Sequence, residues 1–438
     1  MGDVNAKNVF VIALDTPNRR KLEGLRVARE CSFHRLLSDE ALSGGAGYDI
    51  ERMLREGEED LRRFGGSVDA ILAYRDFPES TIQPILAQRL GVPSASLEAV
   101  LKCEHKHWSR VEQKKVVPEH VPRFVRFHPF DADPRAQIDI PYPFWMKPVK
   151  SFASHLGFKV DNDASFERAL NETRKHVKRL SEPFDRVLER VDLPLEVGEV
   201  GQVYCLAEEI IGGHQCTLEG CRSGGETFVL GVVDSIRVAG GSSFQRYQYP
   251  SGLPAGVQAR MRKVAQKVVE QLEYDDACFN VEFFWSEPDD RLWLLEINPR
   301  IALHHADLFE KVDGYSNYEM AVEVGLGRAP TMARGEREFA CAATCFVREL
   351  EDAVVTRVPS EQTVREIEER IPGTRIELRV KEGQRLSDLA EQDAYSYALA
   401  LVYVGGRDEE DLQQRYAQVV RDLDIGLDRR TGAGEGAG

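Results

Sequence analysis

Short apolar runs alternate with helical segments along the first hundred residues of the chain. Residues 8–14 (NVFVIAL) and 67–76 (SVDAILAYRD) are apolar runs, the second of which ends in polar residues, and residues 81–91 (TIQPILAQRLG) carry a helical pattern. Strands that alternate with helices are typical of a parallel sheet covered by helices. The pattern predicts a parallel α/β domain over residues 1–103.

After residue 104 the pattern changes to a mixture of short strands, turns and helices. A basic amphipathic stretch (EHKHWSRVEQKK) precedes a proline-punctuated segment and then FWMKPVK, which is a strand by composition. Gly-Gly pairs, which suit hairpins and loops, separate the strands that follow. Further predicted elements are helices at residues 164–180 and 255–273 and strands at 203–211, 214–221 and 227–238. These elements predict an α+β domain over residues 104–330.

A third region begins beyond Gly327 and again mixes strands with helices. FACAATCFVREL and YSYALALVYVGG have strand patterns, and further elements are predicted as a helix at 360–370, a strand at 375–381 and a helix at 408–423. We expect these to form an α+β cap over residues 331–426. The glycine-rich residues 427–438 are expected to be a disordered tail.

Polar side chains occur in an apolar hairpin near the end of the second domain. Residues 278–285 (CFNVEFFW) and 291–298 (RLWLLEIN) are apolar runs, and the intervening SEPDD suits a turn. Strand side chains alternate between faces. If the hairpin closes symmetrically about residue 289, Glu282 lies opposite Glu296, with Cβ atoms roughly 5 Å apart, where like charges repel. A positively charged group should therefore lie between them.

The same hairpin is a candidate metal site. Two carboxylates and the amide of Asn298 are hard oxygen ligands, which hold Mg²⁺ when substrate phosphates complete its coordination. Arg300 follows and could bind a phosphate or carboxylate in bidentate fashion. Glutamates on the solvent face of a hairpin are a common alternative. The run LWLLEIN has few polar positions, however, so the residues alone leave the metal site and the solvent-face hairpin as equal interpretations.

A lysine at the end of a predicted strand is a second candidate. Lys147 in WMKPVKSFAS precedes a loop of small residues whose backbone NH groups could bind phosphate. The stretch is not a Walker motif, because GxxxxGK[ST] is absent. An exposed lysine beside an ordinary turn is the alternative. A third stretch, AEEIIGG at 207–213, could present backbone groups to an adenine edge, or could be simply a strand and a turn.

Composition and charge narrow the functional classes. A net charge of −16 argues against a dedicated nucleic-acid surface. No apolar run approaches the roughly 20 residues of a membrane-spanning helix, and no leader segment is recognisable. The eight cysteines lack CxxC spacing, so we expect reduced thiols in a cytoplasmic protein rather than disulfides or a zinc site.

Taken in order, several motifs resemble those of the ATP-grasp superfamily. They are HKHWSR (105–110), FWMKPVKSFAS (144–154), AEEIIGG with HQC (207–216), NVEFFW (280–285) and LLEINPRI (294–301). The segment after Arg300 is similar to that of ATP-dependent carboxylate-amine ligases, including L-amino-acid ligases. The resemblance implies an ATP-grasp fold, with a Rossmann-like α/β domain before a grasp domain of two lobes (104–200 and 201–330) and an α+β cap after it.

The resemblance also implies roles for individual residues. Lys106 and Lys147 match the lysines that reach ATP phosphates, and Ser151 to Ser154 match the loop that covers them. Glu208, Glu209 and Ile211 match the adenine hinge, and Gln215 stands where a ribose-binding glutamate is usual. The magnesium ligands correspond to Glu282, Glu296 and Asn298. Arg300 matches the arginine that steadies an acyl phosphate.

Three positions depart from the family pattern, and each concerns a loop or pocket. Lys150 replaces a small residue in the phosphate loop, Gln215 replaces the ribose glutamate, and Leu303-His304-His305 stands where small residues are usual. We therefore expect an altered acceptor pocket. His304 is a candidate catalytic residue there; it and His305 could act as a base or recognise a substrate group, or both could simply be structural. Arg246 and Tyr249 are candidates for acceptor recognition.

The activity implied by the resemblance is ADP-forming ligation. ATP, with Mg²⁺ or Mn²⁺, would phosphorylate a small-molecule carboxylate, and an amine would then attack the acyl phosphate to give an amide. Alternatives are a biotin-carboxylase-like enzyme that uses bicarbonate and a nucleotide-binding protein without turnover. A homodimer is compatible with the sequence, whereas nucleic-acid and membrane partners are not expected.

Overall fold

Three parallel strands form the first sheet of the computed structural model, which describes residues 6–42, 47–151, 156–198, 203–238, 243–333, 335, 338–389 and 396–429. The strands are β1 (Lys7–Ile12), β2 (Cys31–Leu36) and β3 (Ala70–Leu72), in the order β2-β1-β3. Alternate side chains such as Phe10 and Ile12 pack in a buried cluster under the helices. The predicted parallel α/β arrangement is confirmed.

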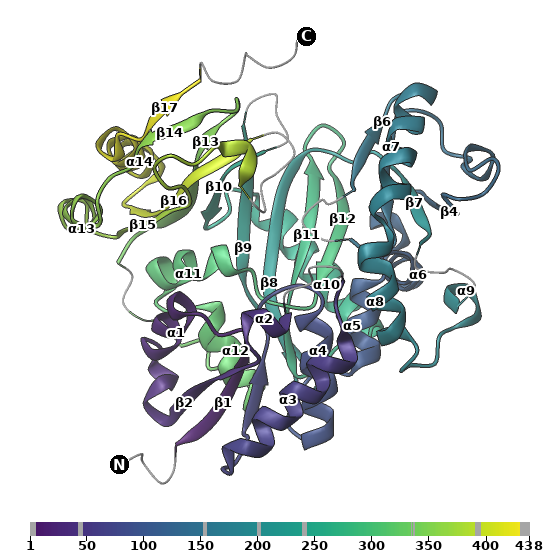
Figure 1. Ribbon diagram of the computed structural model, residues 1–438, viewed down its shortest axis with the longest axis horizontal. Helices are drawn as coiled ribbons and strands as arrows, with labels where there is room; N and C mark the ends of the chain where they lie inside the picture. The colour runs from purple at the N-terminus through teal and green to yellow at the C-terminus, as the bar shows by residue number, and fades with distance from the viewer. Residues whose placement is uncertain are drawn as a thin grey trace.

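Helices connect and cover these strands (Figure 1). They are α1 (Thr16–Glu23), α2 (Asp39–Leu42), α3 (Ile50–Phe64), α4 (Glu79–Leu90) and α5 (Leu97–Glu104). Two of these helices end where the chain turns through a left-handed glycine: α3 at Gly65 and α4 at Gly91. Such a conformation strains side chains with a Cβ atom, which explains the use of glycine there.

A four-stranded antiparallel sheet follows helix α6 (Lys106–Val116). Its order is β4-β7-β5-β6, with β4 (Phe124–Phe127), β5 (Phe144–Pro148), β6 (Phe158–Val160) and β7 (Cys205–Glu209). The helical pattern predicted for 164–180 forms two helices, α7 (Asp163–His176) and α8 (Lys178–Leu188), followed by the single turn α9 (Leu195–Gly198). Strand β7 lies between two neighbours, so its inner residues are buried.

The largest sheet has eight strands and carries the predicted hairpin. Its order is β12-β11-β8-β9-β10-β13-β16-β15, and neighbouring strands are antiparallel. The strands are β8 (His214–Ser223), β9 (Glu226–Arg237), β10 (Phe244–Tyr249), β11 (Ala277–Ser286), β12 (Arg291–Asn298), β13 (Cys341–Glu349), β15 (Thr374–Leu378) and β16 (Tyr397–Gly406). Strands of the expected C-terminal cap therefore continue the same sheet as the hairpin.

The remaining helices lie against this sheet. They are α10 (Ala255–Gln271), α11 (Ala306–Asp313), α12 (Asn317–Gly325), α13 (Glu361–Arg370) and α14 (Glu409–Leu423), with a short 3-10 turn η4 (Leu303–His305) before α11. Helix α12 contacts β3, β8 and β11, and it lies between the first sheet and the largest one (Figure 1). The path from Arg300 to α12 thus runs along the junction of the two sheets.

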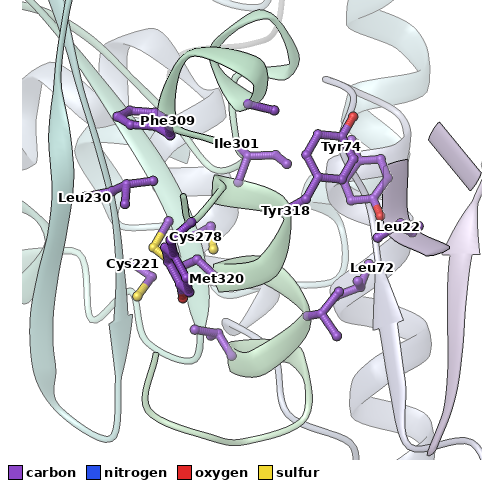
Figure 2. Packing of buried hydrophobic residues seen from close by; sticks show 14 of the residues in the cluster. Leu22, Leu72, Tyr74, Cys221, Leu230, Cys278, Ile301, Phe309, Tyr318 and Met320 are labelled. Atoms are coloured by element: carbon purple, nitrogen blue, oxygen red, sulfur yellow. The ribbon is translucent and has the colours of Figure 1, made fainter. Parts of the chain in front are cut away.

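A buried apolar cluster joins the first domain to the largest sheet (Figure 2). It combines Leu72 of β3 and the nearby Tyr74 with Tyr318 and Met320 of α12, and with residues of the large sheet such as Leu230. The rings of Tyr74 and Tyr318 are 4.9 Å apart. Two strands of the sheet contribute cysteines to this cluster, and all eight cysteines of the chain are free thiols.

The C-terminal residues differ in part from the expected tail. Strand β17 (Gly426–Asp428) pairs with β14 (Val354–Arg357), so residues 427 and 428 belong to a strand rather than to a disordered segment. Residues 430–438 lie outside the described part of the chain. Over the described ranges, no helix is both long and apolar enough to cross a membrane.

Candidate functional site

The hairpin of β11 and β12 brings two carboxylates together. Glu282 is opposite Glu296, as the sequence predicted, and a bulge immediately after Glu282 shifts the rest of the register by one residue. Burial, followed by the charge of Glu296, raises the pKa of Glu282. Because each of two neighbouring carboxylates disfavours ionisation of the other, this pair needs a positive charge.

That positive charge is Lys106, the first residue of α6. Its ammonium pairs with Glu296 Oε1, and the lysine side chain is only 9% exposed. Burial alone would raise the pKa of Glu296, but Lys106 and Lys147 outweigh it and hold the pKa below its usual value. The positive charge beside Glu296 is therefore a lysine that is 190 residues away in the sequence, whereas the positive charge that acts on Glu282 is Arg300.

Asn298 completes the predicted ligand set on the same face. Its amide nitrogen donates to Asn280 Oδ1 at 2.9 Å and to Glu282 Oε1 at 3.3 Å. Its amide oxygen makes no hydrogen bond within the described part of the chain. Two carboxylates and one free amide oxygen fit Mg²⁺, a hard cation that keeps several positions for phosphate and water. Within the described ranges, no group of three or more His, Cys, Asp or Glu side chains could hold a metal ion.

Gln215 also reaches this carboxylate pair. Its amide nitrogen donates to Glu282 Oε2 at 3.0 Å, and Arg237 donates to its oxygen at 2.6 Å. The residue is 5% exposed at the start of β8. Gln215 therefore orients one proposed metal ligand, in addition to its predicted place beside the nucleotide.

Lys147 lies in a buried ion-pair network centred on Glu208. The Glu208 carboxylate accepts from Lys147 at 2.6 Å and from Arg110 Nε at 2.7 Å. Arg110 also donates to the carbonyl oxygens of Leu294 and Leu295 in β12. Glu208 was expected in the adenine hinge, and its side chain points into the protein. It links β7 to Arg110 of α6, and through Arg110 to strand β12 of the hairpin. The buried position of Arg110 was not predicted, because the basic stretch at residues 104–115 has the pattern of an amphipathic helix.

The other hinge residues lie at the exposed end of β7. Glu209 is exposed, and its carboxylate accepts from the backbone NH of Arg123 at 3.3 Å. Ile211 follows in the loop to β8 and is partly exposed. The backbone NH of Glu209 already donates to the Arg123 carbonyl at 2.9 Å, so a ligand would have to use its carbonyl or the backbone of Ile211, and Glu208 cannot offer its side chain.

The phosphate loop is described only at its beginning. Ser151 is buried, and Ser154 lies outside the described residues. Lys150 is not directed to solvent: it pairs with Glu104 and lies over the rings of Phe77 and Phe184 at 5.0 and 4.9 Å. This departure from the family pattern thus places a lysine in the packing between α5, α8 and the residues after β3.

Arg300 is held by a carboxylate that the sequence did not identify. Asp76, which follows β3 of the first sheet, binds the guanidinium in bidentate fashion at 2.6 and 3.0 Å. Burial would raise the pKa of Asp76, but Arg300 outweighs it and holds the pKa below its usual value. Asn280 donates to the Arg300 carbonyl at 2.9 Å, which fixes the backbone as well. A polar residue directly after a predicted parallel strand was the available signal for Asp76.

The two histidines occupy different environments. Burial first, and nearby positive charges second, lower the pKa of His304 to about 3. Its ring stacks on Tyr247 with centroids 6.1 Å apart. His305 is 3% exposed and its Nδ1 lies 2.9 Å from Glu219 Oε1. Glu219, a glutamate inside the apolar run HQCTLEGC, gave the same signal as Glu296 and was missed.

The acceptor candidates on β10 do not meet at the site. Arg246 pairs with Glu409 of α14 at 2.9 Å and, by strand alternation, lies on the opposite face from Tyr247. Tyr249 donates to Asp313 at 2.6 Å and is 7% exposed. Arg246 therefore ties β10 to α14 in this structure, and Tyr247 is the residue of β10 that packs against the histidines.

Comparisons with known proteins agree with this arrangement. The family model described as the ATP-grasp domain matches residues 140–305. No curated protein matches the chain by sequence. Similar solved structures include the L-amino acid ligase from Bacillus licheniformis, with a TM-score of 0.73 and 14% identity over 97% of this chain and 99% of that chain.

Two other similar structures have different activities in their names. The phosphoribosylglycinamide synthetase from Anaerococcus prevotii has a TM-score of 0.62 and 12% identity, covering 96% of this chain and all (100%) of that chain. The biotin carboxylase from Campylobacter jejuni has a TM-score of 0.63 and 14% identity, covering 96% and 92%. At these identities, the likeness demonstrates a shared fold.

Proposed function

The chain belongs to the ATP-grasp superfamily, and we propose that it is an ADP-forming carboxylate-amine ligase. In this reaction a carboxylate oxygen attacks the γ-phosphorus of ATP, ADP leaves, and an amine displaces phosphate from the acyl phosphate to give an amide. The observation that supports this proposal best is the convergence of Glu282, Glu296, Asn298 and Arg300 on one site. The finer assignment to the L-amino-acid-ligase branch rests on the resemblance and on the similar fold.

The proposed metal ligands fit Mg²⁺, or Mn²⁺ in its place. Glu282, Glu296 and Asn298 would hold the ion, which when bound neutralises negative charge on the phosphates. Lys106 would then exchange Glu296 for a phosphate oxygen, because the ion replaces the lysine as the partner of that carboxylate. Lys147 would contribute a second positive charge from β5.

Other residues would bind the nucleotide and the reacting carboxylate. The backbone of Glu209 and Ile211 would contact the adenine edge, Gln215 the ribose, and Ser151 to Ser154 the phosphates. Arg300 would hold the acyl phosphate, since a guanidinium that is already oriented stabilises developing charge without reorganising. Small-molecule carboxylates and amines are the proposed partners, and free thiols accord with a cytoplasmic location.

A biotin-carboxylase-like use of bicarbonate is the second candidate. The likeness to a biotin carboxylase over 96% of this chain favours it specifically. Bicarbonate-dependent ATP hydrolysis that requires biotin, without amide formation, would identify this activity. A nucleotide-binding protein without turnover would bind ATP and release no ADP with any substrate.

The test is ADP release across a matrix of carboxylic acids and amines, with mass spectrometry of the products. Glu296→Gln should lose turnover by about 100-fold or more, because it removes one ligand charge from the metal site. Glu287→Gln, in the exposed turn of the same hairpin, is the matched control and should behave as wild type. Full activity of the Glu296→Gln variant would refute the metal-site assignment.

A further inference from the structure

A glutamate and a histidine form a buried pair beside the proposed site. Glu219 lies on β8 with 0% exposure and His305 ends η4 with 3% exposure. Their contact, from His305 Nδ1 to Glu219 Oε1, is 2.9 Å long. The proposed metal binding and phosphate transfer use neither residue, so the pair requires its own explanation.

The hydrogen bonds of Glu219 determine which tautomer of His305 is favoured. The same oxygen, Oε1, also accepts the backbone NH of Ala302 at 3.0 Å, so it acts as an acceptor. His305 then donates its Nδ1 proton to Glu219, and Nε2 is left with its lone pair. This ring nitrogen makes no hydrogen bond to the described residues. A carboxylate that orients a histidine in this way also stabilises the imidazolium once it forms.

The register of the sheet places this pair near the reacting groups. Glu219 is the cross-strand neighbour of Asn280, and Asn280 is the neighbour of Asn298. Since adjacent strands are separated by about 4.8 Å, Glu219 lies about 10 Å from the proposed metal ligand along the same face. Asn280 lies between them and bonds both to Asn298 and to the carbonyl of Arg300, so the pair is one side chain away from the metal ligand.

The loop from Arg300 to His305 is tied along its backbone. Asn317 donates to the carbonyl of Ala302 at 3.0 Å and Thr344 donates to that of His304 at 2.7 Å. These contacts add to those from Asn280 to Arg300 and from Glu219 to Ala302. The position of His305 relative to Arg300 is therefore set by the protein before any substrate binds.

We propose that His305, oriented by Glu219, accepts the proton that the amine loses when it attacks the acyl phosphate. This inference rests on the proposed function. The amine nitrogen forms a bond to the acyl carbon, the carbonyl π electrons move to oxygen, and one N–H proton passes to His305 Nε2. The carbonyl then re-forms, the bond from carbon to the phosphate oxygen breaks, and phosphate leaves with that electron pair and finally takes the proton.

His304 is the obvious competitor for this role, and the structure disfavours it. Its pKa of about 3 makes it a weak proton acceptor, and its ring stacks on Tyr247 and meets Phe346 edge to face. General bases are most effective when their pKa lies near the working pH. The two adjacent histidines thus divide into an aromatic packing residue and a carboxylate-oriented base.

The experiment compares two nucleophiles in variants of the pair. The carboxylate and amine are the best pair from the ADP-release matrix. Hydroxylamine is the second nucleophile, because the nitrogen of so weak a base, once it has attacked, loses its proton to water without help from a protein base. We expect His305→Gln to lower amide formation by about 100-fold or more while it retains hydroxamate formation. Glu219→Gln should shift the ratio of amide to hydroxamate in the same direction, and His176→Gln, an exposed histidine of α7, is the control.

Each outcome has a distinct meaning. Hydroxamate formation by the His305→Gln variant shows that it is folded and still activates the carboxylate. A ratio of amide to hydroxamate equal to that of wild type overturns the inference and leaves the proposed function intact. Equal loss of both products in His305→Gln and Glu219→Gln also overturns it, because the pair then serves the structure or an earlier step. A wild-type protein that gives neither product with any carboxylate refutes the proposed function itself.

Discussion

Glu208 offers a direct test of whether a residue expected at the adenine hinge instead stabilises the fold. Its carboxylate lies between Lys147 and Arg110, and all three side chains are at most 10% exposed. Glu208→Gln keeps the shape of the side chain and removes its charge. The variant leaves two buried positive charges without their shared partner, which destabilises the protein.

The size of the effect follows from the proton affinity of the carboxylate. Burial alone would raise the pKa of Glu208, but Arg110 and Lys147 outweigh it and lower the pKa from 4.5 to about 2. A tenfold change in proton affinity corresponds to about 1.4 kcal/mol. The ion pairs of Glu208 therefore contribute about 3 kcal/mol to the free energy of unfolding. Because the pKa is lower in the folded state, this contribution is complete above about pH 5 and is lost as the pH falls towards 2.

Thermal unfolding in the absence of nucleotide measures this contribution. For a unit of about 150–250 residues, 3 kcal/mol lowers Tm by about 6–12 °C. Glu209→Gln, the exposed neighbour on the same strand, should change stability by less than about 0.5 kcal/mol. A wild-type Tm for Glu208→Gln would refute the ion-pair argument. If ATP binding were weakened at the same time, Glu208 would be a nucleotide-binding residue, as the adenine-hinge prediction implies.

Two further predictions concern the loop that follows β12, which carries Arg300 and His304. Asp76→Asn should lower kcat by about 10–100-fold and leave the KM for ATP nearly unchanged, because Arg300 loses the partner that orients it. Steady-state assays measure both constants. An unaltered kcat would show that Asp76 does not orient the arginine. His304→Phe should make the free energy of unfolding less dependent on pH below 6.5. The pKa of His304 is about 3 in the folded state and 6.5 in the unfolded state, so this residue lowers the free energy of unfolding by about 1.4 kcal/mol for each pH unit below 6.5. Unfolding measured at pH 7.5 and 5.5 tests this, and an equal pH dependence in variant and wild type contradicts it.

Local patterns in the sequence were sufficient to predict most elements and one critical register. Alternation of apolar and polar residues located the hairpin, and the assumed symmetry about residue 289 gave the observed pairing of Glu282 with Glu296. Both signals act within about twenty residues, so no knowledge of the fold was required. The bulge after Glu282 was not predicted, and it shifts the pairing of Phe283 to Ser286 by one residue from that expected for symmetry about residue 289.

The partners of the site residues could not be predicted in the same way. Arg300 and Asp76 are 224 residues apart, and Arg110 and Glu208 are 98 residues apart. Pairs at such separations depend on how the sheets pack, and periodicity carries no information about that packing. The direction of Glu208 was nevertheless accessible in principle, since alternation along β7 places Glu208 and Glu209 on opposite faces.

Each proposed cationic residue of the site has a carboxylate partner. The identity of that partner determines whether the cation would change partners when the metal binds or keep the partner it has. Lys106 pairs with Glu296, which belongs to the proposed metal ligands, whereas Lys147 and Arg300 pair with Glu208 and Asp76, which do not. Metal binding would therefore displace only Lys106 from its partner. Lys147 and Arg300 would keep theirs and act as oriented positive charges, which is what electrostatic preorganisation requires. On this reasoning, Asp76, which follows β3 of the first sheet, would contribute to the proposed reaction, because it fixes the arginine on which the acyl phosphate would lie.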